Sequence, residues 1–149
     1  CDVYTTDASG LSSTRAAAAD PGKWVVLPEI ISKEPLGPLV RHGDHQWGDV
    51  VRWSLNAMII AEELGITSEN VDAQKSSNVP EVLRLLGVEG SYGEMLELAP
   101  DWAYQIIKQI GNYSESYEAN VGPDTPLEIA RGLNALWTQG GILYAPPFR

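Results

Sequence analysis

Basic residues, cysteine and long apolar runs are all scarce in this chain of 149 residues. Lys and Arg number 10 against 20 Asp and Glu, which gives a net charge of −10. This deficit of positive charge argues against a nucleic-acid partner, whose phosphates need a basic face, and against docking on anionic membranes. No apolar run reaches the ~18 residues that a membrane-spanning helix needs. The hydrophobic share of 44% is ordinary, so the composition predicts one acidic globular domain.

The single cysteine, Cys1, leaves the cellular compartment open. A cysteine at this place is compatible with a buried thiol in a strand, half of a disulfide, a lipid-bearing residue or a site of processing or proteolysis. No apolar signal region led by Lys or Arg is present. One cysteine therefore does not decide between a reducing and an oxidising compartment.

The first 43 residues favour short strands. Residues 1–6 and 23–28 are rich in β-branched and aromatic side chains, which predicts two strands. Between them an alanine-rich stretch predicts a helix over 11–19, with Asp7 as a candidate N-cap. Prolines keep residues 35–40 extended, because proline lacks an amide donor and restricts the residue before it.

After residue 43 the pattern becomes helical, since apolar residues recur at three- and four-residue steps. The longest predicted helix covers 47–64, with Asp44 as its N-cap and Gly65 just beyond its end. Shorter helices are predicted over 80–86, 92–98, 100–110, 113–120 and 127–137. Four aromatic residues on or near these helices are interpreted as core rather than as a ligand cage: Trp47, Trp53, Trp102 and Tyr104.

Asp7 is the residue best suited to bind a ligand. It follows a predicted strand, and ligands of open α/β sheets lie beyond the carboxyl ends of strands. A carboxylate there can accept a charge-assisted hydrogen bond from a ligand ammonium group. The competing interpretation is that Asp7 only caps the helix that follows. The two roles are compatible.

Other clusters give weaker signals. The cluster His42-Gly-Asp-His45 matches no zinc spacing, and Asp44 is better placed as a helix cap, so no metal site is predicted. No serine stands in a Gly-x-Ser-x-Gly motif, and Glu62 and Glu63 are neighbours that point in different directions on a helix. The sequence therefore predicts neither an enzyme nor a cofactor. The remaining classes are a binding module and a stand-alone helical interaction or structural domain with no small-molecule ligand.

Several segments resemble one family. Cys1-Asp-Val-Tyr-Thr-Thr-Asp7 resembles the strand that ends at the ligand-binding aspartate of type II amino-acid-binding proteins. Leu36-Gly-Pro-Leu-Val-Arg-His-Gly-Asp44 resembles the strand that recrosses their hinge, and residues 47–64 resemble the helix after it. Arg131-Gly-Leu-Asn-Ala-Leu-Trp137 and Tyr144-Ala-Pro-Pro-Phe-Arg149 are similar to the general L-amino-acid-binding subfamily of ABC importers. The likeness spans nearly the whole chain.

This resemblance implies an α/β fold: a helix-rich C-terminal part of the two-lobe periplasmic-binding-protein type II fold. Residues 1–34 would be the end of the second, ligand-binding lobe, and residues 35–43 a hinge-crossing strand. Residues 44–149 would be a helical portion completing the first lobe. The resemblance also implies that Asp7, with Thr6 beside it, accepts the ligand ammonium group.

The function implied by the resemblance is that of the periplasmic substrate-binding component of an ABC transporter for polar L-amino acids, such as glutamate, glutamine, aspartate and asparagine. Its partners would be ABC permease subunits and a free L-amino acid, which only the intact protein would bind. The family's carboxylate-binding arginine comes from an N-terminal part that this sequence lacks. We also expect self-association through apolar surface at Leu36, Leu39, Val40 and one side of the 47–64 helix.

Overall fold

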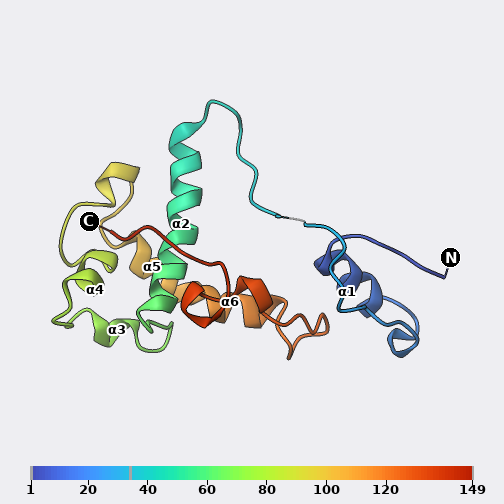
Figure 1. Ribbon diagram of the computed structural model, residues 1–149. Helices are drawn as coiled ribbons and strands as arrows, with labels where there is room; N and C mark the ends of the chain where they lie inside the picture. The colour runs from blue at the N-terminus through green and yellow to red at the C-terminus, as the bar shows by residue number, and fades with distance from the viewer. Residues whose placement is uncertain (1, 34, 149) are drawn as a thin grey trace. The chain divides into compact units, whose positions relative to one another are not determined.

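The computed structural model describes residues 2–33 and 35–148 and is built mainly from helices (Figure 1). Its contacts divide the chain into two compact units. Unit 1 contains Cys1–Gly37 and Tyr117–Arg131, and unit 2 contains Pro38–Ser116 and Gly132–Arg149. Tyr117–Arg131 thus belongs with the N-terminal residues, although it follows most of unit 2 in the sequence. The predictions for Cys1 lie outside the described residues.

The longest helix of unit 2 is α2, His45–Glu63. Its first turn is capped by Asp44, whose Oδ1 accepts a hydrogen bond from the Trp47 amide at 3.1 Å. Just beyond its end, Gly65 has a φ of 66°, a left-handed conformation that glycine adopts without steric cost. The predicted helix, its cap and its stop are all confirmed.

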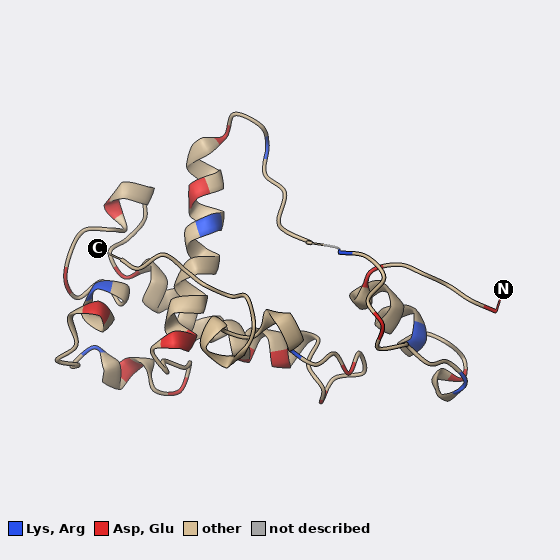
Figure 2. Cartoon of the chain, viewed as in Figure 1, with Lys and Arg blue, Asp and Glu red and all other residues tan. Residues whose placement is uncertain are grey.

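Shorter helices surround α2 in unit 2. They are α3 (Val71–Gln74), α4 (Pro80–Leu85), α5 (Trp102–Ile110) and the 3₁₀ turn η2 (Glu94–Leu96). Helix α5 packs on both α2 and α3, and η2 packs on α2. One apolar core joins these elements, and its largest fully buried side chains are Ile60, Ile66, Leu85, Leu86, Ile107 and Val71. Acidic residues are spread along the helices of this unit rather than gathered on one of them (Figure 2).

Helix α6, Tyr113–Asn120, begins with a reciprocal pair of hydrogen bonds. Asn112 Oδ1 accepts from the Glu115 amide at 3.0 Å, and Glu115 Oε2 accepts from the Asn112 amide at 2.8 Å. This is a capping box. The Asn112 side chain, 5% exposed, also donates from Nδ2 to the Ile66 carbonyl at 2.9 Å. Glu115 further accepts from the amide and hydroxyl of Ser68, so the cap ties α6 to the loop after α2.

We expect Asn112→Ala to lower the free energy of unfolding by about 1–3 kcal/mol, because it removes the cap and leaves the buried Ile66 carbonyl without this donor. Urea unfolding followed by tryptophan fluorescence measures the change. Asn78→Ala, at an exposed asparagine in a loop, is the matched control and should change the stability by less than about 0.5 kcal/mol. Equal losses in the two variants would contradict the role given to Asn112.

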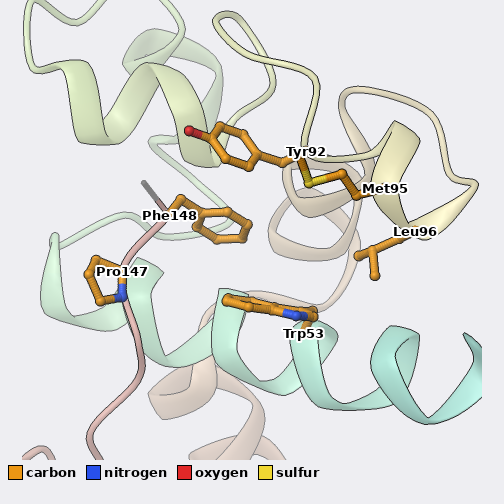
Figure 3. Close-up of a pocket in the computed structure, with 6 residues that line it drawn as sticks. All are labelled: Trp53, Tyr92, Met95, Leu96, Pro147 and Phe148. Atoms are coloured by element: carbon orange, nitrogen blue, oxygen red, sulfur yellow. The ribbon is translucent and has the colours of Figure 1, made fainter. Parts of the chain in front are cut away.

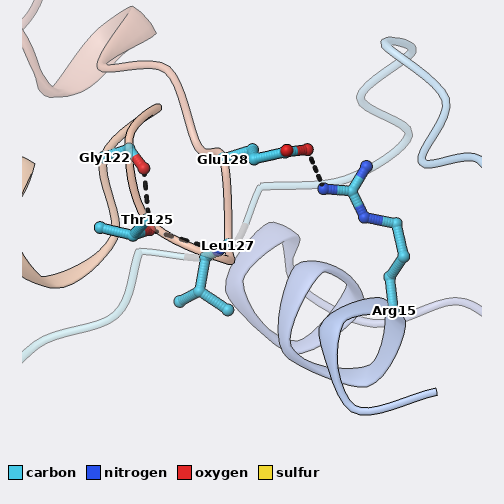
Figure 4. Close-up of polar contacts among 5 residues, drawn as sticks. All are labelled: Arg15, Gly122, Thr125, Leu127 and Glu128. Carbon is cyan, nitrogen blue, oxygen red and sulfur yellow. Dashed lines mark hydrogen bonds and ion pairs between the residues drawn. The ribbon is translucent and has the colours of Figure 1, made fainter. Parts of the chain in front are cut away.

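Unit 1 contains α1 (Ala8–Ala16) and the 3₁₀ turn η1 (Pro21–Lys23). Arg15 on α1 forms an ion pair with Glu128 at 2.6 Å, which links the two segments of the unit (Figure 4). The loop around Glu128 is shaped by Thr125, whose hydroxyl donates to the Gly122 carbonyl at 2.8 Å and accepts from the Leu127 amide at 3.2 Å. Among the described residues, every fully buried apolar side chain lies in unit 2, whereas the apolar side chains of unit 1 are at most half-buried.

The predicted strands at 1–6 and 23–28 are not formed. Residues 2–6 and 24–27 have no regular secondary structure, although Trp24 itself has extended backbone angles, and no strand occurs within the described residues. The one isolated β-bridge among the described residues pairs Leu136 with Leu143, both in unit 2. An extended segment becomes a strand only when a neighbouring segment accepts and donates its ladder of hydrogen bonds. The prediction of these two strands was therefore wrong, and Lys23, at the start of the second, lies in the 3₁₀ turn η1.

Two predicted helices are also wrong. Residues 92–98 form only the short η2, and Glu97 ends it in the left-handed region at φ 57°. Residues 127–137 contain only the 3₁₀ turns η3 (Gly132–Asn134) and the start of η4 (Trp137–Gln139). Positive φ values at Glu128 and Gly132 are incompatible with a continuous right-handed helix there. Helix α1 is shifted toward the N-terminus from its predicted range, because its cap is Asp7 itself.

The apolar surface expected around the hinge segment is exposed. Leu36 in unit 1 is 69% exposed, and Leu39 and Val40 in unit 2 are 98% and 41% exposed. On α2, Trp47 and Leu55 also face solvent. Self-association through this surface stays a prediction. Of the helices in the described part of the chain, none is both long and apolar enough to cross a membrane.

Candidate ligand-binding site

Asp7 lies where residues 2–6 meet helix α1. Its Oδ2 accepts hydrogen bonds from the Gly10 amide at 2.8 Å and from the Ser9 hydroxyl, while its Oδ1 accepts from the Thr6 hydroxyl at 3.3 Å. Asp7 is therefore the N-cap of α1, so the capping interpretation is confirmed. Thr6 contacts Asp7 through its hydroxyl, and its role in ligand binding stays a prediction. The structure adds Ser9 and Gly10, which the sequence pattern did not single out as its partners.

The hydrogen bonds around Asp7 keep its carboxylate charged. Hydrogen bonds from the Ser9 hydroxyl and then the Gly10 amide hold the pKa of Asp7 below its usual value, because they stabilise the ionised form. A carboxylate offers about four lone-pair sites. Two of the three donors described reach Oδ2, and the third reaches Oδ1 over a long distance. Oδ1 of this half-buried side chain can thus accept one more donor, such as an ammonium group.

The His42, Asp44 and His45 cluster lies at the start of α2 in unit 2. Asp44 is engaged as the cap of that helix. Nowhere in residues 2–33 and 35–148 do three or more His, Cys, Asp or Glu side chains lie close enough to hold a metal ion. The prediction that Asp44 acts as a cap is confirmed.

A cavity lies in unit 2, where the C-terminal tail packs against α2 and η2. This cavity of about 190 Å³ is lined by Trp53, Tyr92, Met95, Leu96, Pro147 and Phe148 (Figure 3). The Phe148 ring, in a side chain only 6% exposed, lies between Trp53 and Tyr92, with ring centroids 5.3 Å and 5.6 Å away. None of the described residues that line the cavity is charged, so these residues offer no partner for an amino acid's ammonium and carboxylate groups.

Of the aromatic residues predicted as core, the structure buries some and exposes one. Trp102 is buried, and Trp53 and Tyr104 are partly buried against the core of unit 2. Trp47 is 54% exposed, so that prediction was wrong. Trp47 lies in the first turn of α2, whereas the residues that this helix buries begin at Ala57. Among the described residues, no tryptophan is a hydrogen-bond partner of Asp7.

Curated proteins match the chain over its whole length. The glutamate/glutamine/aspartate/asparagine-binding protein BztA of Rhodobacter capsulatus is 57% identical to it. The putative amino-acid ABC transporter-binding protein YhdW of Escherichia coli is 56% identical, and the general L-amino acid-binding periplasmic protein AapJ of Rhizobium johnstonii is 57% identical. The chain spans only 44% of the length of each. No family model matches it.

A solved structure agrees with these relatives. An ABC transporter periplasmic binding protein from Brucella ovis, with glutathione bound, is 54% identical with a TM-score of 0.95. It matches 100% of this chain, which covers 47% of the solved one. The fold is therefore part of a periplasmic binding protein, and the predicted fold class is confirmed. Within that class, the chain is related over its whole length to the amino-acid-binding proteins of ABC transporters, as the resemblance predicted.

Proposed function

We propose that this chain is part of the periplasmic substrate-binding component of an ABC importer for polar L-amino acids. The observation that carries the proposal is the 56–57% identity, over the whole chain, to proteins named as amino-acid-binding components of such transporters. The partners would be a free amino acid and the permease subunits of the importer. The protein would bind and release its ligand rather than transform it. The relatives give no support to a stand-alone helical domain.

The ligands named for two of these proteins share one chemical feature, a free amino-acid head group. BztA is named for glutamate, glutamine, aspartate and asparagine, and the Brucella ovis structure contains glutathione. Glutathione begins with a γ-linked glutamyl residue, so it also carries a free α-ammonium and α-carboxylate. We propose that the ligand class is defined by this head group. Asp7, with Thr6 beside it, would accept the ammonium group, since Asp7 is ionised and Oδ1 has capacity for one more donor.

The assignment of lobes is also a proposal. Residues 1–34 would end the ligand-binding lobe, residues 35–43 would cross the hinge, and residues 44–149 would complete the other lobe. Tyr117–Arg131 groups with Cys1–Gly37 in one compact unit, which supports adding Tyr117–Arg131 to the ligand-binding lobe. The lobes would then close about the crossing segment when the ligand binds and open about it when the ligand is released.

The chain alone should bind amino acids weakly or not at all. One charge-assisted hydrogen bond contributes about 1.5–3 kcal/mol. The translational and rotational freedom lost on binding costs at least about 4 kcal/mol, whereas micromolar affinity needs about 8 kcal/mol. We expect titration calorimetry of the 149-residue chain with glutamate, glutamine, aspartate, asparagine and glutathione to show no binding below millimolar concentrations.

A chimera supplies the matched comparison. In it, this chain replaces the region of E. coli YhdW that it matches, which is 44% of that protein. We expect the chimera to bind at least one of the five ligands with micromolar or better affinity. A folded chimera that binds none of them would contradict the proposed function. Tight binding by the chain alone would show that the site needs no further residues.

A further inference from the structure

Two donors converge on one oxygen of Asp7. The Gly10 amide, at 2.8 Å, and the Ser9 hydroxyl both donate to Oδ2. The other oxygen, Oδ1, accepts a long bond of 3.3 Å from the Thr6 hydroxyl. Both donors to Oδ2 belong to the first turn of α1, so the helix itself holds this oxygen. The carboxylate is therefore bound asymmetrically, and Oδ1 is its less occupied side.

The Ser9 hydroxyl does more than the helix cap requires. An N-cap side chain accepts from the amide of the second or third helical residue, and the Gly10 amide fills this role by itself. One donor leaves a carboxylate free to turn about its Cβ–Cγ bond, because that torsion has broad wells. A second donor to the same oxygen restricts the rotation. Ser9, a half-buried residue, thus fixes the orientation of Asp7 in a way that capping alone does not.

Gly10 gives Asp7 and Thr6 the space that this arrangement needs. A Cβ atom at position 10 would lie 2.8 Å from Thr6 Cγ2 and 3.1 Å from Asp7 Oδ1. Carbon atoms in contact normally stand about 3.5–4.0 Å apart, so any larger residue would displace the Thr6 side chain and crowd Oδ1. Glycine is also a poor helix former. Its presence in α1 therefore favours the environment of Asp7 over the stability of the helix.

A ligand ammonium group fits the oxygens that this arrangement presents. Such a group has three N–H donors. One can reach Asp7 Oδ1, and a second can reach the Thr6 hydroxyl, because a hydroxyl accepts as well as donates. These two oxygens already lie 3.3 Å apart, so one nitrogen atom can contact both.

We propose that Ser9 and Gly10 are positioning residues for ligand binding. Ser9 fixes the carboxylate of Asp7, and Gly10 leaves space for Thr6 and Oδ1, so that both oxygens face the ligand ammonium group together. The inference rests on the proposed function, because it assigns the residues that support the same site. Each of the two acts through Asp7 or Thr6 rather than by touching the ligand.

Ser9→Ala in the 149-residue chain tests the role of Ser9 without any ligand. We expect the pKa of Asp7, followed by NMR through the chemical shift of its carboxyl carbon, to rise toward its usual value. The reason is that the Ser9 hydroxyl makes the largest contribution to lowering this pKa. The Gly10 amide, the Thr6 hydroxyl and Asp7's own backbone also lower it, and burial raises it. Ser9→Thr keeps the hydroxyl and should keep the pKa low.

Ser13→Ala is the matched control for this measurement. It makes the same chemical change in the same helix, but the Ser13 hydroxyl donates to the Ser9 carbonyl, at 2.7 Å, and not to Asp7. The pKa of Asp7 should therefore be the same in Ser13→Ala as in the unmodified chain.

Glutamate binding by the YhdW chimera is the second measurement. At neutral pH Asp7 is ionised with or without Ser9, so Ser9→Ala should weaken binding only by the cost of ordering one side chain, about two- to tenfold. On acidification the variant should lose affinity at a higher pH than the unmodified chimera, because its carboxylate, with the raised pKa, is protonated first. Ser9→Thr should restore both the affinity and the pH profile.

Gly10→Ala separates the site from the helix. It should weaken glutamate binding by the chimera about tenfold or more, because it displaces Thr6 and crowds Oδ1. The helical circular dichroism signal should not fall, since alanine is the better helix former. A purely structural role for Gly10 predicts the reverse, which is a stable or stronger helix with full affinity.

The outcomes distinguish this inference from the proposed function. An unchanged pKa of Asp7 in Ser9→Ala would overturn the role of Ser9, and a loss of affinity without that change would mean that Ser9 contacts the ligand itself. Full affinity in Gly10→Ala would overturn the role of Gly10. If the proposed function fails instead, the pKa of Asp7 responds to Ser9→Ala as expected while the chimera binds none of the ligands.

Discussion

Replacing Asp7 by asparagine in the YhdW chimera should lower its affinity for glutamate by about 10- to 150-fold. Asparagine is as good an N-cap as aspartate, so α1 should remain capped through Gly10. The substitution removes the negative charge, however, and a charge-assisted hydrogen bond to the ligand ammonium group contributes about 1.5–3 kcal/mol. Each 1.4 kcal/mol corresponds to about a tenfold change in affinity. Titration calorimetry at neutral pH measures the change.

Two further variants test whether a loss of affinity comes from the missing charge at Asp7 or from a change in the helix cap. Asp7→Ala removes both the charge and the cap, so it should lose affinity and also reduce the helical circular dichroism signal. Asp44→Asn changes an aspartate that caps α2 by the same kind of bond, from Trp47 to Oδ1 at 3.1 Å. It should leave the affinity unchanged. If Asp7→Asn binds glutamate as tightly as the unmodified chimera, Asp7 is a helix cap and nothing more.

Ile107→Ala should lower the free energy of unfolding of this chain by about 2–5 kcal/mol. Ile107 lies on the inner side of α5 and is 0% exposed. Truncating it removes apolar contacts from the core shared by α2, α3 and α5 and leaves a cavity there. Urea unfolding followed by tryptophan fluorescence reports the loss directly, because Trp53 and Trp102 belong to the same core or pack against it.

Helix α5 also provides the control for this measurement. Ile110 is in the last turn of the same helix but is 58% exposed. Ile110→Ala makes the same chemical change without opening a cavity, so its effect should stay within about 0.5 kcal/mol. A loss for Ile107→Ala no larger than that for Ile110→Ala would mean that the core of unit 2 is not closely packed.

Local signals were sufficient to predict helix α2 and the capping role of Asp7. The cap at Asp44, the apolar spacing along 47–64 and the glycine at 65 all lie close together in the sequence and act on one helix. Asp7 is likewise defined by its immediate neighbours, since its described hydrogen bonds come from residues within three positions. Whether Asp7 also binds a ligand depends on groups distant in the sequence. That part of the site stays a prediction.

Features that depend on distant residues were predicted less well. The segments 2–6 and 24–27 have strand-like composition, but β-propensity measures fit to a sheet surface and cannot supply the neighbouring strand. The 127–137 segment has apolar residues at helical spacing, yet Glu128 adopts a left-handed conformation and its carboxylate bonds Arg15, more than a hundred residues earlier in the chain. The resemblance to a family predicted the fold class correctly, because it draws on complete proteins of that class.

The Phe148 ring closes the core of unit 2 from the far end of the sequence. Its partner Trp53 stands on α2, and 95 residues separate them. A protein is synthesised from its N-terminus, so α2 emerges with this aromatic face uncovered until the tail has followed. Contacts between residues so far apart in sequence form slowly, and apolar surface exposed meanwhile favours aggregation. Trp53 and Tyr92 therefore lack this aromatic partner during synthesis and gain it only when Phe148 packs between them.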